Sequence, residues 1–133
     1  MLKYPVKILM AFGETFEPEG EEFYHWLLEN GYPELAALSS GIRGSKEAIA
    51  WLMNNKYPQF AALDGAIDKD VKAVAWLHKF KFDFLIVFAD AVNGKQEAIS
   101  WLRKKDLGIF LRLAAKISGF RNKQEFDYHK LHF

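Results

Sequence analysis

The chain contains no cysteine, which excludes disulfide bonds, thiolate metal sites and cysteine nucleophiles. It has no apolar run near the roughly 20 residues that a membrane-spanning helix requires. The N-terminal sequence MLKYPVKILMAFG has an apolar core too short for a secretory signal and no small-residue cleavage site. We therefore expect a cytoplasmic protein that is not inserted in a membrane.

Catalytic motifs are also missing: there is no His-Glu-x-x-His, no Gly-x-Ser-x-Gly and no phosphate-binding P-loop. A loop rich in carboxylates could hold a catalytic pair, but an exposed acidic loop is the more ordinary interpretation. Its acidic residues are Glu14, Glu17, Glu19, Glu21 and Glu22. We predict that the protein is not an enzyme.

Histidine is scarce, with four in the chain. His25 and His78 hold unrelated positions, whereas His129 and His132 are spaced so that they could share a metal ion with Glu125. Two histidines near a chain end are a weak indication of a metal site. We predict no metal and no other cofactor.

The net charge of +1 conceals an asymmetry. Residues 1–66 carry five Lys or Arg against nine Asp or Glu, whereas residues 67–133 carry thirteen against eight. This pattern is unlike that of a uniformly basic nucleic-acid-binding protein. It allows an acidic end to meet a basic end of another copy, which would give a weak homo-oligomer.

The four tryptophans, Trp26, Trp51, Trp76 and Trp101, are each 25 residues apart. Leucine follows each of them, and the octapeptide KEAIAWLM at 46–53 returns as QEAISWLR at 96–103. Aliphatic or aromatic residues recur at fixed distances after each tryptophan. Repetition with a period of 20–50 residues is typical of solenoid proteins.

Each unit is predicted to contain two short helices. The first, typified by residues 46–55, has a wide apolar arc, with Ser45 and Asp70 as N-caps. The second, typified by residues 58–67, starts at a proline and carries Phe60, Leu63 and Ile67 on one face. Its other face is formed by small residues, which allow close helix packing and suggest that these helices line a concave surface.

The sequence therefore predicts an all-α fold, a single curved α-solenoid of about ten short helices. Residues 1–21 would form a partial leading unit and a loop, residues 22–118 four repeats, and residues 119–133 a C-terminal cap. Such end units cover the core where a terminal repeat lacks a neighbour.

Residues 20–118 resemble the helical part of ankyrin repeats. Gly94, Glu97, Ala98, Ile99 and Leu102 fit the pattern of a glycine-containing turn followed by an outer helix, and Gly44, Glu47, Ala48, Ile49 and Leu52 fit it as well. The Thr-Pro-Leu-His motif is absent, and a 25-residue unit has no room for the projecting β-hairpin. The resemblance implies a binding scaffold without catalytic activity.

The tryptophans allow two interpretations. They could be a ladder of exposed aromatic rings that grips a peptide, a sugar or an extended chain. They could instead be the same core residue repeated in each unit, half covered at the edge of the apolar arc. We favour the structural interpretation because repeat proteins need an equivalent core residue in every unit.

Units three and four depart from the earlier ones on the predicted concave face. Phe84 and Ile109 stand where Glu34 and Gln59 stand earlier, and charged residues replace small ones nearby. Such departures are where a solenoid can encode its partner. The predicted partner-binding residues are Phe84, Val87, Asp90, Ile109, Arg112 and Lys116. The alternative is that the C-terminal segment covers Phe84 and Ile109.

A basic run, Arg103-Lys104-Lys105, could bind phosphate or an acidic surface. Acidic residues interrupt the surrounding segment, so a solvated face is the more ordinary meaning. We expect no nucleic-acid partner. The leading hypothesis is a protein-binding scaffold that recognises another protein or peptide on its concave face. The alternatives are end-to-end self-assembly and, less favoured, a small enzyme or metal protein.

Overall fold

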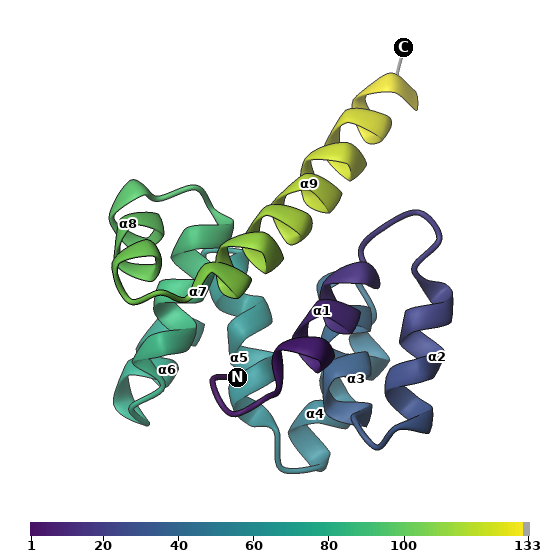
Figure 1. Ribbon diagram of the computed structural model, residues 1–133, viewed down its shortest axis with the longest axis horizontal. Coiled ribbons are helices and arrows are strands. Elements are labelled where there is room, and N and C mark those ends of the chain that lie inside the picture. The colour runs from purple at the N-terminus through teal and green to yellow at the C-terminus, as the bar shows by residue number, and fades with distance from the viewer. Residues whose placement is uncertain (132–133) are drawn as a thin grey trace.

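The computed structural model describes the backbone of residues 1–131 and the side chains of residues 1–124. Within that part the chain is all-helical, with nine helices in sequence (Figure 1). These are α1 (Val6–Glu14), α2 (Glu21–Glu29), α3 (Pro33–Ile42), α4 (Lys46–Asn54), α5 (Pro58–Ile67), α6 (Val71–Lys79), α7 (Asp83–Val92), α8 (Gln96–Lys104) and α9 (Gly108–Leu131). The prediction of an all-α fold is confirmed.

Local chemistry accounts for where the helices begin. Pro33 and Pro58 lie in the first turns of α3 and α5, where a missing N–H costs nothing. The Ser45 hydroxyl accepts a hydrogen bond from the Ala48 N–H at 3.1 Å, and the Asp70 carboxylate accepts one from the Lys72 N–H at 2.9 Å. Both residues therefore cap helices as the sequence predicts.

The helices also end in a regular way. Gly44, Lys69 and Gly94 follow α3, α5 and α7 with φ of 108°, 64° and 77°. A residue in this left-handed conformation reverses the chain, so that backbone N–H groups after the helix bind its last carbonyl groups. Glycine adopts it without steric cost, whereas Lys69 does so with a side chain.

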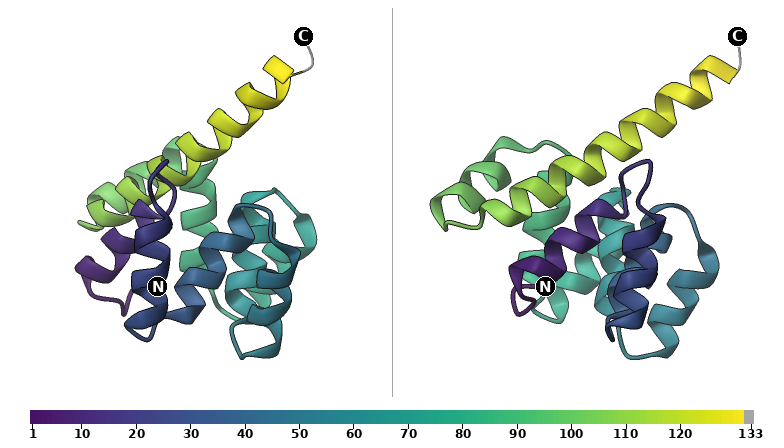
Figure 2. Two further views of the ribbon diagram at one scale, coloured as in Figure 1. Left: turned by 90° about the vertical axis from the view of Figure 1, so that its right-hand side faces the viewer. Right: turned by 45° about the vertical axis from the view of Figure 1, so that its right-hand side comes forward.

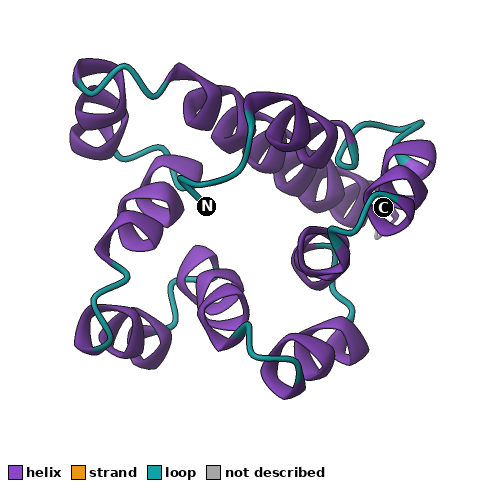
Figure 3. Cartoon of the chain, turned by 60° about the horizontal axis from the view of Figure 1, so that its bottom comes forward, coloured by secondary structure: helices purple, strands orange, loops and turns teal. Residues whose placement is uncertain are grey.

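Helices adjacent in sequence pack against each other, consistent with a helical repeat. The odd-numbered helices form a row, hereafter the inner row, in which α1, α3, α5, α7 and α9 each contact the next. The even-numbered helices α2, α4, α6 and α8 pack outside this row (Figure 3). Each contributes one fully buried leucine to the core: Leu27, Leu52, Leu77 and Leu102.

Small residues allow two of these contacts to be close. A Cβ atom on Gly65 of α5 would lie 2.7 Å from the Cβ atom of Ala73 on α6. A Cβ atom on Gly41 of α3 would lie 2.5 Å from the end of the Ile49 side chain on α4. The small-residue face therefore brings α3 and α5 close to the outer helices that follow them, α4 and α6.

The inner row returns on itself, because α9 packs against α1 (Figure 2). Lys116 of α9 forms ion pairs with Glu14 at 3.1 Å and Glu17 at 2.8 Å. Hydrogen bonding to Glu17 raises the pKa of Lys116. The sequence analysis did not predict this contact between the first and last helices of the row.

A buried hydroxyl pair joins α1 to α3. The Ser39 hydroxyl donates to the Thr15 hydroxyl at 2.7 Å, which in turn donates to the Phe12 carbonyl at 2.6 Å. Both hydroxyl groups belong to residues with almost no exposed surface. The chain of bonds satisfies polar groups that burial would otherwise leave without partners.

The predicted cap is not a separate helix, because α9 is continuous from Gly108 to Leu131. Phe120 stands where earlier units place Ser45, Asp70 and Lys95, and the helix continues through it although Gly119 is equivalent to Gly44 and Gly94. Phe120 lies against Phe16, with ring centroids 5.9 Å apart. The continuous helix extends well beyond the other helices (Figures 1 and 2).

Across the described residues, none of the helices combines the length and the apolar character that a membrane span would need.

Candidate functional site

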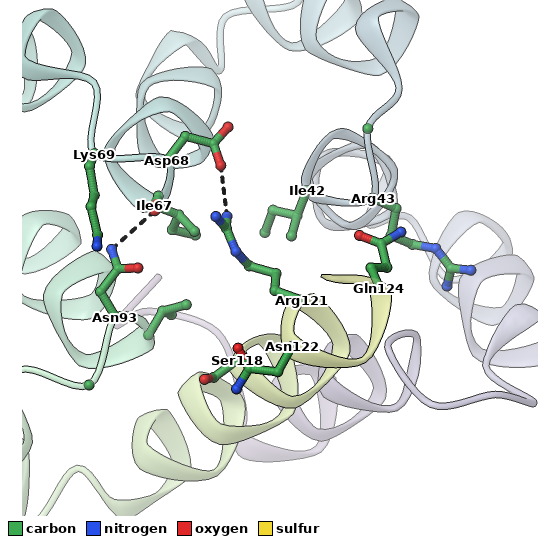
Figure 4. A pocket seen from close by; sticks show the side chains of 13 residues that line it. Ile42, Arg43, Ile67, Asp68, Lys69, Asn93, Ser118, Arg121, Asn122 and Gln124 are labelled. Carbon is green, nitrogen blue, oxygen red and sulfur yellow. Dashed lines mark hydrogen bonds and ion pairs between the residues drawn. The ribbon is translucent and has the colours of Figure 1, made fainter. Parts of the chain in front are cut away.

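A polar cavity of about 880 Å³ opens where the C-terminal ends of α3, α5 and α7 face the middle of α9 (Figure 4). Its apolar floor consists of the last residues of those helices, Ile42, Ile67 and Val92. Its walls are polar and come from the turns after the helices and from α9. They comprise Arg43, Gly44, Asp68, Lys69, Asn93, Gly94, Ser118, Arg121, Asn122 and Gln124.

Three wall residues hold the same position, directly after an inner helix: Arg43, Asp68 and Asn93. The Arg43 guanidinium reaches back to the Thr15 carbonyl at 2.6 Å, and the Asn93 amide reaches back to the Ile67 carbonyl at 3.0 Å. Each of these side chains thus donates to the backbone at the end of the preceding inner helix. Asp68 cannot do so, because an ionised carboxylate only accepts hydrogen bonds.

Asp68 instead accepts a hydrogen bond from Arg121 of α9 at 2.8 Å. In the described part of the chain the backbones of α5 and α9 do not pack against each other, and this ion pair spans the cavity between them (Figure 4). Both side chains are accessible, with 59% of Asp68 and 32% of Arg121 exposed. Such exposed pairs contribute only about 0–1 kcal/mol to stability.

Asp64 lies one helical turn before Asp68 on α5. Partial burial, together with the neighbouring Asp68 carboxylate, raises the pKa of Asp64 to about 6, against the opposing effect of Arg121. The carboxylates of Asp64 in α5 and of Asp68 just after it therefore both interact with the Arg121 guanidinium.

The cavity offers hydrogen-bond donors and acceptors, and its described lining contains no histidine. Elsewhere in the described part of the chain, no three His, Asp or Glu side chains come together in a way that could hold a metal ion. His132 and the side chains of Glu125 and His129 lie outside the described residues.

Aromatic side chains dominate the opposite, N-terminal ends of the inner helices. Trp51 stacks on Tyr57, with centroids 6.4 Å apart, and Trp76 stacks on Phe82 at 5.9 Å. Behind them, the Tyr4 hydroxyl donates to the buried Glu34 carboxylate at 3.1 Å. Burial, with Glu34 as the next contribution, raises the pKa of Tyr4.

The tryptophans lie between the two interpretations. Trp26 and Trp76 are partly buried against the core, whereas Trp51 and Trp101 are 36% and 39% exposed. Trp51, Trp76 and Trp101 each pack on an aromatic residue near the start of an inner helix. They cover the edge of the core with one ring face and leave part of the indole at the surface.

The six predicted binding residues occupy different surroundings. Phe84 is half-buried and packs edge-on against Phe110 at 4.9 Å, near Trp101. Val87 is half-buried, and Asp90 pairs with Lys95 at 3.1 Å.

The three on α9, namely Ile109, Arg112 and Lys116, lie beside Met10, Gly13 and Glu14 of α1. Ile109 is half-buried there and Arg112 is exposed. The helix next to Ile109 is therefore α1, not the C-terminal segment considered above. Nothing in the structure tests binding at the six residues, which stay a prediction.

The sequence analysis missed most of the cavity. One signal was present: the residue seventeen positions after each tryptophan is polar and directly follows an aliphatic residue. These residues are Arg43, Asp68, Asn93 and Ser118. Their chemical variety at an equivalent position marks them as candidates.

Comparison of the chain with protein-family models, with curated proteins and with solved structures found no match.

Proposed function

We propose that the protein is a non-catalytic scaffold that binds another protein or peptide, and that the polar cavity is its main partner site. In this proposal the chain is a curved solenoid of four 25-residue helix pairs, similar to the helix pairs of ankyrin repeats without their β-hairpins. Helical repeats of this kind present partners with surfaces assembled from equivalent positions.

The cavity carries the proposal. Its walls draw side chains from four inner helices or the turns after them, and these side chains differ in charge and hydrogen-bonding capacity at the same position of successive units. Arg43 and Asn93 also stabilise the fold by binding the backbone, but that role does not require a different charge in each unit. A repeat fold does need such variety to distinguish one partner from another.

Self-assembly through opposite charges is less well supported. Lys116 already pairs with Glu14 and Glu17, and Arg121 pairs with Asp68, within one molecule. The Lys116 pairs join the basic second half of the sequence to its acidic first half, whereas the Arg121–Asp68 pair lies within the second half. They leave fewer free charges for contacts between copies.

Affinity capture from native lysate, followed by mass spectrometry, tests the proposal. The bait is compared with Lys69→Glu/Asn93→Ala in the cavity and with Phe84→Ala/Arg112→Glu on the face predicted from the sequence. Lys56→Glu is the matched control, because Lys56 and Lys69 are exposed lysines with φ of 72° and 64°.

We expect a stoichiometric partner that the cavity variant loses and the control retains. If only Phe84→Ala/Arg112→Glu loses the partner, the protein is still a binding scaffold, but its site is the face predicted from the sequence instead of the cavity. Absence of any stoichiometric partner would contradict the proposed function.

A further inference from the structure

We propose that the polar cavity accepts a carboxylate from an acidic segment of the partner, and that this carboxylate displaces Asp68 from Arg121. The inference rests on the protein-binding function proposed above and names the chemistry of the bound segment. It starts from the one ion pair that spans the cavity.

Arg121 is placed to bind a carboxylate. Its side chain leaves α9 and extends into the cavity towards α5 (Figure 4). A guanidinium carries five N–H donors in a planar fork, and Nη1 makes the contact with Asp68. Carboxylates match this fork with two parallel hydrogen bonds, which gives an incoming ligand better geometry than the single bond to Asp68.

Asp68 is the ligand that can be replaced. Its side chain is more exposed than that of Arg121, at 59% against 32%. It is therefore well hydrated when released, and little free energy is lost with the pair. Its equivalents Arg43 and Asn93 bind the backbone, whereas Asp68 is bound by a side chain from across the cavity.

Lys69 supplies the second cation. It borders the cavity directly after Asp68, and Figure 4 places its ammonium group beside Asn93. Lys69 forms no ion pair with any described residue. Arg43 is not counted, because its guanidinium donates to the Thr15 carbonyl and lies over the Phe120 ring.

Two features oppose an anion here. Asp64 and Asp68 both lie close to Arg121, and the negative ends of three helix dipoles point towards the cavity. The dipole effect is weakened because backbone N–H groups of the following turns bind the last carbonyl groups. For α5, the Asp68, Lys69 and Asp70 N–H groups bind the carbonyls of Asp64, Ala66 and Gly65. The carboxylates of Asp64 and Asp68 still oppose a bound anion, so replacing them with neutral residues should strengthen binding of the carboxylate ligand.

The experiment measures fluorescence anisotropy of a fluorescein-labelled hexaglutamate peptide with blocked ends. Hexaglutamine is the neutral control, and the ionic strength is kept at about 50 mM because screening grows with salt. The protein variants are Arg121→Ala, Asp68→Asn, Lys69→Glu and the control Lys56→Glu. Circular dichroism melting curves establish that each variant is folded.

The two members of the ion pair should have opposite effects. Asp68→Asn should tighten hexaglutamate binding, since it removes a competitor for Arg121. Arg121→Ala should weaken it by about tenfold, the usual loss for a charged hydrogen bond. Lys69→Glu should weaken it as well, whereas Lys56→Glu should leave it unchanged.

The inference is wrong if Asp68→Asn and Arg121→Ala both weaken binding, because the pair then only supports the fold. It is also wrong if hexaglutamine, or inorganic phosphate as a competitor, binds as well as hexaglutamate. If hexaglutamate does not bind while Lys69→Glu/Asn93→Ala still loses the captured partner, the scaffold stands and the acidic segment is excluded.

Discussion

At the N-terminal ends of α5, α7 and α9, aromatic rings cover the surface, whereas at the C-terminal ends of α3, α5 and α7 the same helices border a polar cavity. Both ends are built from positions that recur along the sequence. At the aromatic end the recurring side chains are similar, as in Tyr57 and Phe82. At the cavity end they are Arg43, Asp68 and Asn93. Similar side chains just before the inner helices are what packing requires, whereas varied side chains just after them are what the proposed recognition would require.

The largest predicted effect on the free energy of unfolding comes from a substitution at the aromatic end. Phe110→Ala removes a buried ring that packs edge-on against Phe84 and Phe88. We expect a loss of about 3–5 kcal/mol in the free energy of unfolding, because the cavity that remains cannot fully collapse. Urea denaturation measures it. Arg112→Ala, an exposed change on the same helix, should stay within about 0.5 kcal/mol.

A second substitution tests the close helix contact near the cavity end. Gly65→Ala places a methyl group 2.7 Å from the Ala73 Cβ atom, which can move only with the backbone of α6. We expect a loss of about 1–3 kcal/mol in urea denaturation. Gly41→Ala meets the flexible end of Ile49 and should cost less. If Gly65→Ala and Gly41→Ala cost the same free energy of unfolding, then moving the α6 backbone away from α5 costs no more than rotating the Ile49 side chain.

A third substitution tests the hydroxyl pair that joins α1 to α3. Ser39→Ala removes the donor to the Thr15 hydroxyl and leaves a buried oxygen short of one hydrogen bond. We expect a loss of about 1–2 kcal/mol, measured by thermal or urea unfolding. Ser40→Ala is the neighbouring control, since Ser40 is only partly buried. A neutral Ser39→Ala would mean that the pair contributes no stability.

The smallest predicted effect is the pH dependence of the cavity end. The pKa of Asp64 is raised to about 6 in the folded chain, above the unfolded value near 3.9. The folded state therefore holds this proton more tightly, so its contribution to stability is present at pH 4 and lost as pH rises through 6. After allowance for solvent screening, the change is about 1 kcal/mol.

Asp64→Asn should remove that part of the pH dependence in unfolding experiments between pH 4 and 7. The exposed Asp106→Asn is the control, because asparagine tolerates the left-handed conformation of that residue, whose φ is 57°. If the two variants follow the same pH profile, Asp64 does not titrate in this range.

The sequence predicted the helices well because their signals are local. Proline at the start of α3 and α5, the N-caps Ser45 and Asp70, and glycine after α3 and α7 each act within one turn. The continuation of α9 through Phe120 was missed. The 25-residue spacing and Gly119, equivalent to Gly44 and Gly94, suggested a boundary there that the structure does not have.

The contact between α1 and α9 could not be predicted in the same way. Periodicity reports which residues face a neighbouring unit, but the return of a row to its first member depends on small rotations added over all the units. The cavity depends on that return, because Arg121 reaches Asp68 only when α9 lies across from α5. The candidate site was therefore less predictable than the elements that carry it.

The contact between α1 and α9 also limits how such a chain can change in length. An open array can gain a unit by duplication, because each addition copies an existing interface. Here an added helix pair would separate α9 from α1, and with it Lys116 from Glu14 and Glu17. We therefore expect the chain to tolerate substitution at equivalent positions far more readily than the insertion of a further helix pair.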